Sequence, residues 1–361
     1  MSELNNNVFM LATVVVGALF AIWVVVRSLR KYNLSGKTVL ITGGSRGLGL
    51  VMARELMREG AHLAICARDQ AELERARTDL IKYGADVLAV PCDVTDIEQV
   101  NKMVQTVRDS FGQINVLINN AGAIAVGPIE VMTPEDYEAA MKIHFWAPLY
   151  TTLAVLPEMR QRHEGRIVNI SSIGGKISVP HLLPYSASKF ALTGFSEGLR
   201  AELAKDGIVV TTICPGLMRT GSPHNAIFKG QHRAEYTWFS ISDSLPIISM
   251  SAERAARQII AACKHGDAEV VLSLTAQIAV KFHELFPGLT ANLLGFFNTL
   301  LPKPGGIGTD SAKGKDSYSS VSPSGLTALS DKAAEQNNEI AEAGLDSELF
   351  SDRSEEIQKI S

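Results

Sequence analysis

Paired cysteines are absent from this chain of 361 residues. Its four cysteines, Cys66, Cys92, Cys214 and Cys263, form no C-x-x-C pair, and no cluster of histidines accompanies them. Structural zinc sites and disulfide frameworks need such groupings, so the sequence argues against both. We therefore expect no metal site and four buried free thiols in a reducing compartment.

A basic excess is also lacking. The 34 Lys and Arg residues face 38 Asp and Glu residues, which leaves a net charge of −4. Nucleic-acid-binding domains need a cationic surface, so no nucleic-acid partner is expected. No internal repeat stands out. With 46% hydrophobic residues, the chain is long enough for one large domain with additions or for two small domains.

Charge is missing altogether from residues 8–26, VFMLATVVVGALFAIWVVV. As a helix this run is about 28 Å long, close to the ~30 Å hydrocarbon core of a bilayer. Arg27, Arg30 and Lys31 follow at once, whereas only Glu3 precedes the run. We predict a single-pass transmembrane anchor in residues 1–31, with the following domain facing the cytoplasm by the positive-inside rule. The alternative is a buried helix of the fold.

Short apolar runs then alternate with helical patterns. Helices are predicted at residues 47–59 and 70–83, and strands at 38–42, 61–66, 86–90, 116–118, 166–169, 209–213 and 269–272. The predicted strands are uniformly rich in Val and Ile, which is typical of a parallel sheet covered on both faces. The sequence therefore predicts an α/β fold with a doubly wound, mostly parallel, Rossmann-like sheet.

A glycine-rich loop, Thr42-Gly43-Gly44-Ser45-Arg46-Gly47-Leu48-Gly49, lies between the first predicted strand and the first predicted helix. Glycines let the backbone turn sharply and approach a pyrophosphate, and free amides at a helix start attract its charge. A lone glycine triplet is a weak signal, but this one stands at the strand-to-helix junction that the mechanism requires. The loop predicts a dinucleotide site; a plain turn is the alternative.

The residues near the predicted ribose site are cationic. The second strand ends in Cys66-Ala67-Arg68, without an acid to bind a ribose 2′-hydroxyl, and Arg46 lies in the loop. Two guanidinium groups favour a 2′-phosphate, so we predict NADP(H) rather than NAD(H). A solvated pair of arginines is the alternative.

Tyr185 and Lys189 are spaced i, i+4 and so share one face of a helix. A nearby ammonium lowers the pKa of a phenol, which makes Tyr185 a predicted general acid or base. Ser172 precedes Tyr185 by thirteen residues, at the end of a predicted strand, where its hydroxyl can hold a substrate oxygen. A Tyr-x-x-x-Lys pattern alone is common, but the combination with the glycine loop is not.

Together these motifs resemble the short-chain dehydrogenase/reductase family, over residues 35–272. The resemblance covers the T-G-x-x-x-G-x-G loop, an Asp after the third strand, Asn119-Asn120-Ala121-Gly122, the Ser/Tyr/Lys set and a Pro-Gly pair. It implies cofactor contacts, beside Arg68, from Gly43, Ser45, Arg46, Gly47, Leu48, Gly49, Asp93, Val94, Asn120, Ala121, Gly122, Tyr185, Lys189, Pro215, Gly216, Met218 and Thr220. It also implies a homodimer.

The same resemblance implies a mechanism. Ser172 binds the carbonyl oxygen, Tyr185 donates the proton during reduction, and Lys189 holds the nicotinamide ribose and lowers the Tyr185 pKa. One position departs from the family, since His144 stands where an asparagine usually helps to hold a proton-carrying water. His144 is therefore a fourth candidate catalytic residue that titrates near neutral pH, or else a packed core imidazole.

The remaining segments bear on the substrate. Residues 221–250, with Trp238 and Phe239, are predicted to form an apolar lid, and residues 273–301 to form apolar helices that contact a membrane or form a lid or dimer surface. Residues 302–361 are poor in large apolar side chains and predict a disordered tail; a weak amphipathic helix in residues 331–360 is the alternative for its second half. The sequence favours a hydrophobic or lipid carbonyl substrate; a soluble-substrate reductase for sugars or ketoacyl chains, and a low-turnover cofactor-binding sensor, are the alternatives.

Overall fold

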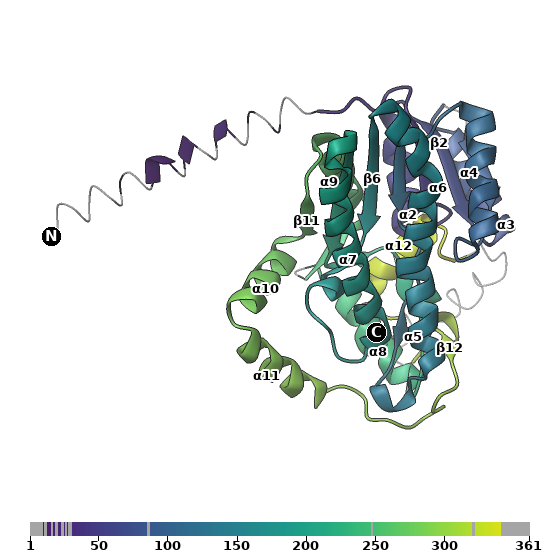
Figure 1. Ribbon diagram of the computed structural model, residues 1–361. Helices are drawn as coiled ribbons and strands as arrows, with labels where there is room; N and C mark the ends of the chain where they lie inside the picture. Colours follow the sequence, from purple (N-terminus) through teal and green to yellow (C-terminus); the bar gives the residue numbers. More distant parts are fainter. Residues whose placement is uncertain are drawn as a thin grey trace.

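The computed structural model of the chain is shown in Figure 1. It describes residues 10, 13–15, 17–18, 21–22, 25, 27, 31–84, 87–246, 248–319 and 322–340. Most of the predicted anchor, and residues 341–361 of the predicted tail, lie outside these residues. Within the described part of the chain, no helix is both long and apolar enough to cross a membrane.

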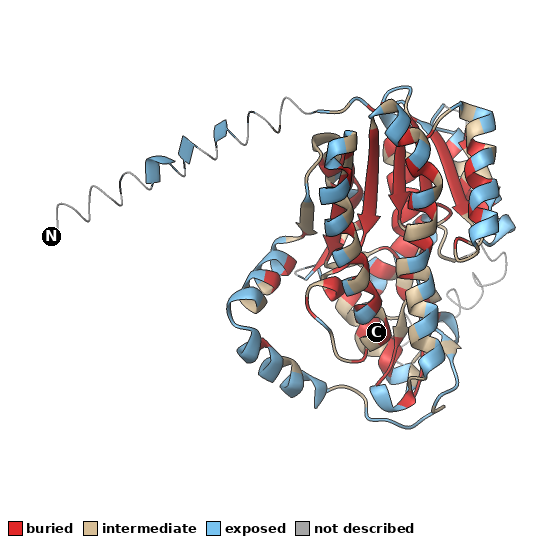
Figure 2. Cartoon of the chain, viewed as in Figure 1, coloured by how far each residue is buried: buried red, intermediate tan, exposed pale blue. Residues whose placement is uncertain are grey.

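Seven parallel strands form the central sheet, in the order β11-β7-β6-β4-β1-β2-β3. The five inner strands are buried over most of their length, as Figure 2 shows, whereas the edge strands β3 and β11 are mostly of intermediate exposure. The strand order reverses between β1 and β4, which creates the topological switch point of a doubly wound sheet. The strands are β1 (Thr38–Thr42), β2 (His62–Ala67), β3 (Val87–Pro91), β4 (Val116–Asn119), β6 (Gly165–Ile170), β7 (Ile208–Pro215) and β11 (Glu269–Leu272).

Helices cover both faces of this sheet (Figure 1). One buried cluster joins the sheet to α2 (Gly47–Arg58), α3 (Gln70–Ile81) and α9 (Ala252–His265). A second joins the opposite face to α4 (Ile97–Phe111), α6 (Ala147–Arg162) and α7 (Leu183–Leu203). Helix α5 (Pro134–Met141) runs into α6 through a π-helical turn, Lys142–Trp146.

Smaller elements lie beyond the carboxyl ends of the strands. They are β5 (Ala125–Val126), β8 (Leu217–Arg219), β9 (Ile227–Phe228), α8 (His232–Ser244), β10 (Ser249–Ser251), α10 (Leu274–Leu285), α11 (Pro287–Asn298), β12 (Ala312–Lys313) and α12 (Ala328–Gln336). Strands β5, β9 and β12 form one small sheet, and β8 pairs with β10. The predicted lid thus contains β9, α8 and β10, whose buried Phe228, Tyr236 and Phe239 form a separate apolar cluster.

The predicted strands and the parallel α/β class are confirmed, with strand boundaries that differ by at most two residues. The four cysteines are buried and free, as expected. One prediction is wrong: residues 302–319 and 322–340 are not disordered. They pack on the body through β12 and α12, because backbone pairing and small buried side chains such as Ala333 and Ala334 replace the large apolar residues that the segment lacks.

Candidate active site

The candidate site lies where β1, β4 and β6 end. These three strands are neighbours in the sheet, and their carboxyl ends lie at the same edge because they are parallel. The glycine loop follows β1, Asn119-Asn120-Ala121-Gly122 follows β4, and Ser172 follows β6. The fold therefore brings together motifs that are separated by more than a hundred residues in the sequence.

The glycine loop has the geometry of a phosphate cradle. Gly43 and Gly47 have φ values of +64° and +53°, which favour glycine, and a Cβ on Gly43 would meet the backbone of Ala121. A Cβ on Gly49 would strike the carbonyl oxygen of Gly43. The loop opens directly into α2, whose first residue is Gly47. These features fit the pyrophosphate of a dinucleotide, whose charge the helix start attracts.

Asn120 holds this loop in place. Its side-chain amide donates to the carbonyl oxygens of Thr42, at 3.1 Å, and Gly43, at 2.9 Å. The Thr42 hydroxyl in turn accepts from the backbone amides of Asn120 and Ala121. The end of β4 therefore supports the cradle.

The structure brings the Ser/Tyr/Lys set together. Tyr185 and Lys189 lie on α7, whose first turn contains Pro184, and the Tyr185 ring and the Ser172 hydroxyl both lie next to Gly174. The Lys189 ammonium lies 5.6 Å from the centre of the Tyr185 ring and donates to the carbonyl oxygen of Ile170 at 2.8 Å. The Ser172 hydroxyl also accepts from the Gly174 amide at 3.0 Å, which fixes its direction. Hydroxyl, phenol and ammonium thus face one region beside the cradle.

Burial, more than charge, determines the pKa values of Tyr185 and Lys189. It raises the pKa of Tyr185 above 10, against a smaller opposing effect of the Ser172 hydrogen bond. It also lowers the pKa of Lys189, which is only 4% exposed, to about 7. The net direction of the Tyr185 pKa in this structure is therefore upward, not downward. The reason is that loss of hydration disfavours both charged forms, the phenolate and the ammonium.

His144 is a packed imidazole rather than a group poised near neutral pH. It is 1% exposed, and burial, together with the charge of Lys189, lowers its pKa well below 6.5. Its Nε2 accepts from the Ala123 amide at 3.2 Å, so its Nδ1 carries the proton and donates to Ser188 at 2.8 Å. Ser188 passes a hydrogen bond to the carbonyl oxygen of Tyr185. The ring therefore links the β4 loop to the catalytic helix.

The other predicted cofactor residues lie around the same edge. Val94 and Thr220 are buried, whereas Arg68 is exposed at the end of β2. Asp93 accepts from the amide and hydroxyl of Thr95 and shapes the turn after β3. Pro215 ends β7 inside the sheet, and Gly216 joins it to β8, which contains Met218.

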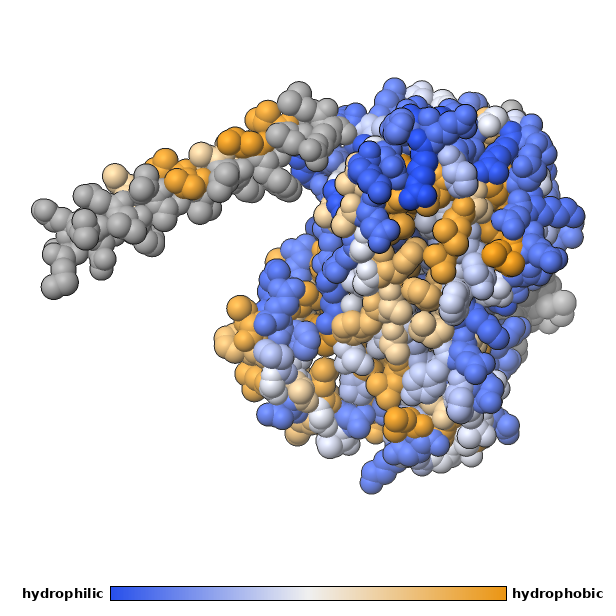
Figure 3. Space-filling view, in the orientation of Figure 1, coloured by the Kyte–Doolittle hydropathy of each residue, from blue (hydrophilic) through white to orange (hydrophobic). Residues whose placement is uncertain are grey.

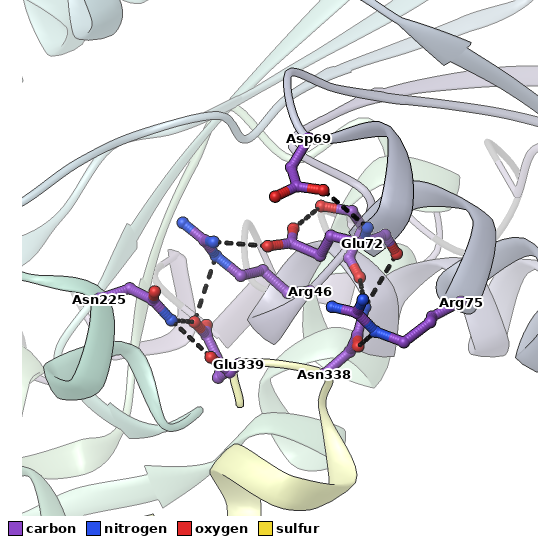
Figure 4. A network of polar contacts seen from close by, with 8 residues as sticks. Arg46, Asp69, Glu72, Arg75, Asn225, Asn338 and Glu339 are labelled. Carbon is purple, nitrogen blue, oxygen red and sulfur yellow. Dashed lines mark hydrogen bonds and ion pairs between the residues drawn. The ribbon is translucent and has the colours of Figure 1, made fainter. Parts of the chain in front are cut away.

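Sequence reasoning missed the acids around the glycine loop. Figure 4 shows Glu72, from α3, and Glu339, from the C-terminal segment, on either side of Arg46. Arg46 pairs with Glu72 at 2.7 Å and with Glu339 at 3.2 Å, and the Ser45 hydroxyl donates to Glu72. Only the position of Glu72, three residues after Asp69 at the start of the next helix, pointed to a capping acid; no sequence signal indicated Glu339.

A doubly wound parallel sheet with a phosphate cradle beside a Ser/Tyr/Lys set is the arrangement found in oxidoreductases that use a nicotinamide cofactor. The family model described as short chain dehydrogenase matches residues 37–227. The chain belongs to this family.

Comparison with curated relatives supports the same family. The chain is 33% identical to dehydrogenase/reductase SDR family member 7B of Bos taurus, over 76% of this chain and 86% of the relative. It is 41% identical to a dehydrogenase/reductase SDR family protein 7-like of Anopheles gambiae, over 54% of this chain. It is 38% identical to ketoacyl reductase HetN of a Nostoc strain, over 51% of this chain. The matches span 63% of the mosquito protein and 64% of the Nostoc protein.

Solved structures share the fold. A short-chain dehydrogenase from Streptomyces avermitilis is 30% identical with a TM-score of 0.62, over 73% of this chain and 97% of that one. L-sorbose reductase from Gluconobacter frateurii, complexed with NADPH and L-sorbose, is 28% identical with a TM-score of 0.60, over 67% of this chain and 97% of that one.

Proposed function

We propose that this chain is an NADP(H)-dependent reductase that interconverts a hydrophobic ketone and its secondary alcohol. The observation that carries the proposal is the convergence of Ser172, Tyr185 and Lys189 beside the glycine loop. Ser172 orients the carbonyl oxygen, and Tyr185 transfers a proton to it. The buried Lys189 holds the ribose side of the site. The nicotinamide supplies the hydride.

Two cations support NADP(H). Arg46 lies in the cradle and Arg68 at the end of β2, where a 2′-phosphate needs a partner. Glu72 opposes this preference, because it already pairs with Arg46. The NADPH in the related sorbose reductase is in keeping with the proposal. Arg68→Asp should lower kcat/KM for NADPH and leave that for NADH nearly unchanged.

The apolar lid supports a hydrophobic substrate. Phe239 is buried, and the indole of Trp238 donates to Glu235, which also pairs with His181 in the loop before α7. A fatty acyl-CoA reductase of Acinetobacter baylyi, 35% identical over 54% of this chain, is in keeping with this proposal, whereas the related ketoacyl reductases fit the soluble-substrate alternative. Acyl-chain ketones, steroids, retinoids and sphingoid bases are all compatible with such a lid.

We also propose that the chain is attached to a membrane through residues 8–26, with its catalytic domain on the cytoplasmic side, and that it forms a homodimer through α6 and α7. Helices α10 and α11 support the membrane attachment, because they carry many exposed apolar side chains, some of which are visible as orange patches between hydrophilic ones in Figure 3. For the dimer, exposed Trp146, Leu153 and Phe190 on or next to α6 and α7 form the proposed contact. Light scattering in detergent should give twice the chain mass, and Leu153→Glu should reduce it.

The test of the enzyme is NADPH consumption against a panel of lipid ketones, with sugars and short ketoacyl esters as the competing class. Tyr185→Phe should lower kcat by about 10²- to 10⁴-fold while NADPH still binds. Tyr83→Phe, at an exposed tyrosine, is the matched control. Full activity in Tyr185→Phe would disprove the mechanism. NADPH binding without consumption by any ketone would instead favour the low-turnover sensor.

A further inference from the structure

The C-terminal segment returns to the cofactor side of the molecule. After α11 it passes the small sheet, where β12 pairs antiparallel with β9, and ends in α12, drawn in yellow in Figure 1. Ala334 of α12 is fully buried against Gly221, where a Cβ on the glycine would strike it. Ser330 of the same helix donates to the buried Asp243 of α8. These contacts hold the end of α12 next to the glycine loop.

Three consecutive residues then contact the loop. The carbonyl oxygen of Asn337 accepts from the Gly47 amide at 2.8 Å, the first amide of α2. The side-chain amide of Asn338 donates to the carbonyl oxygens of Ser45, at 2.9 Å, and Glu72, at 3.0 Å. The segment therefore uses a helix-start amide of the kind that a pyrophosphate needs.

Glu339 supplies a carboxyl group. Its carboxylate pairs with Arg46 and accepts from the Asn225 side chain at 2.7 Å, and the side chain is only 5% exposed. A Cβ on Gly47 would strike its Oε1, so the carboxylate lies against the part of the loop where the glycine leaves room. Figure 4 shows the carboxylate between Arg46 and Asn225. Carboxylate and phosphate oxygens accept from the same donors.

We propose that residues 337–339 are an intrachain competitor of the dinucleotide, and that the cofactor binds only when they leave the cradle. Asn337 and Glu339 together use the Gly47 amide, the Arg46 guanidinium and the space beside Gly47. A cofactor phosphate needs the same three features, so the two occupants exclude each other. The inference rests on the proposed function only in that a nicotinamide dinucleotide binds this loop.

The expected consequence is a weakened apparent affinity. If the segment is docked in about nine molecules of ten, the apparent Kd for NADPH is about tenfold higher than that of the open cradle. Conversely, NADPH should release residues 337–340. Any ligand or modification that draws the segment away would then activate the enzyme.

The experiment compares three full-length variants with the wild type. Glu339→Ala removes the carboxylate, and Ala334→Glu forces α12 away from Gly221. Glu335→Ala, at an exposed position of the same helix, removes the same charge without touching the loop. Two readouts are needed. NADPH and NADH affinity is measured by nicotinamide fluorescence, and hydrogen–deuterium exchange is measured in peptides that cover residues 43–50 and 330–340.

We expect Glu339→Ala and Ala334→Glu to bind NADPH about tenfold more tightly, and Glu335→Ala to match the wild type. NADPH should raise exchange at residues 330–340 of the wild type. Unchanged affinity in variants whose exchange shows the segment released would overturn this inference and leave the proposed function standing. Failure of every variant to bind either dinucleotide, with the segment released, would overturn the proposed function and this inference with it.

Discussion

His144 occupies a position where the family usually carries an asparagine. Its imidazole is neutral in the folded protein. Both of its nitrogens are used, one by the Ala123 amide and one by Ser188. A buried imidazole with a lowered pKa resists protonation in the folded state, whereas the unfolded chain takes up a proton below pH 6.5. We therefore expect the residue to affect stability at mild acidity more than it affects catalysis.

The sign of this effect can be measured. The stability that neutral His144 contributes is present above pH 6.5 and is lost as the pH falls from 6.5 toward the folded-state pKa. The loss approaches about 1.4 kcal/mol per pH unit. Urea unfolding between pH 7.5 and 5 should show a steeper decline for the wild type than for His144→Asn. If kcat of the wild type showed an ionisation near pH 6–7 that His144→Asn lacked, the neutral ring would be the wrong description.

Glu339 gives a second pH dependence. Burial raises its pKa to about 7 in the docked segment, with Glu72 adding to the rise, while Arg46, Asn225 and His224 oppose it. Docking is therefore favoured at low pH and weakens as the pH rises toward about 7.

Accordingly, wild-type affinity for NADPH should increase from pH 5.5 to 7.5, by at most about tenfold per pH unit. Glu339→Gln keeps the amide contacts but cannot titrate, so its affinity should change less over the same range. Parallel pH profiles for the two proteins, measured by fluorescence titration, would contradict this assignment.

At the scale of the element, two helical glycines differ in whether their surroundings leave room for a side chain. Gly49, in the first turn of α2, lies against the carbonyl oxygen of Gly43, so Gly49→Ala has no room for its Cβ. Gly198, in the middle of α7, is exposed with no atom within 4 Å of an added Cβ.

Gly49→Ala should abolish dinucleotide binding and lower the Tm, because the loop must open to accept the methyl group. Gly198→Ala should raise the free energy of unfolding by roughly 0.5–1 kcal/mol, since alanine loses less backbone entropy in a helix. Fluorescence titration and thermal unfolding of both variants check the pair. Normal binding by Gly49→Ala would show that the cradle is looser than the structure indicates.

At the scale of the whole molecule, the helices α10 and α11 bury few of their residues. Only three of their residues, Ala276, Val280 and Thr290, are buried. Arg27, at the end of the predicted anchor, pairs with Asp267, just before the edge strand β11 that leads into α10. Arg27 therefore lies near the amino end of β11, whereas α10 begins just after the carboxyl end of the same strand. The exposed apolar side chains of this pair and the turn that follows are Leu274, Ile278, Leu285, Phe286, Leu289, Leu293, Phe296, Phe297 and Leu300.

We expect a chain that begins at residue 31 to bind liposomes of zwitterionic and anionic lipid through this helix pair. The double variant Leu285→Glu, Phe296→Glu should release it, because two charges in the acyl region are costly. Ile129→Glu, at an exposed apolar residue elsewhere, should not. Equal liposome flotation of the double variant and its parent would assign this surface to another partner.

The sequence alone was sufficient to predict the sheet, the glycine loop and the Ser/Tyr/Lys set. Strand patterns such as residues 38–42, and the i, i+4 spacing of Tyr185 and Lys189, are local, and local backbone preferences and the hydrophobic effect act on them directly. The parallel order of β1, β4 and β6 then brings the motifs together at one edge, as topology requires.

The tertiary structure decided the pKa values of the site and the order of the C-terminal segment. Both depend on burial, which removes hydrating water from each group. Burial reverses the expected direction of the Tyr185 pKa and keeps His144 neutral. It also gives order to residues 322–340, whose composition predicts disorder: they are held by contacts with residues more than a hundred positions away, such as that of Glu339 with Arg46. No local sequence pattern indicates such a long-range contact. The position of this segment at the phosphate cradle is therefore visible only in the tertiary structure.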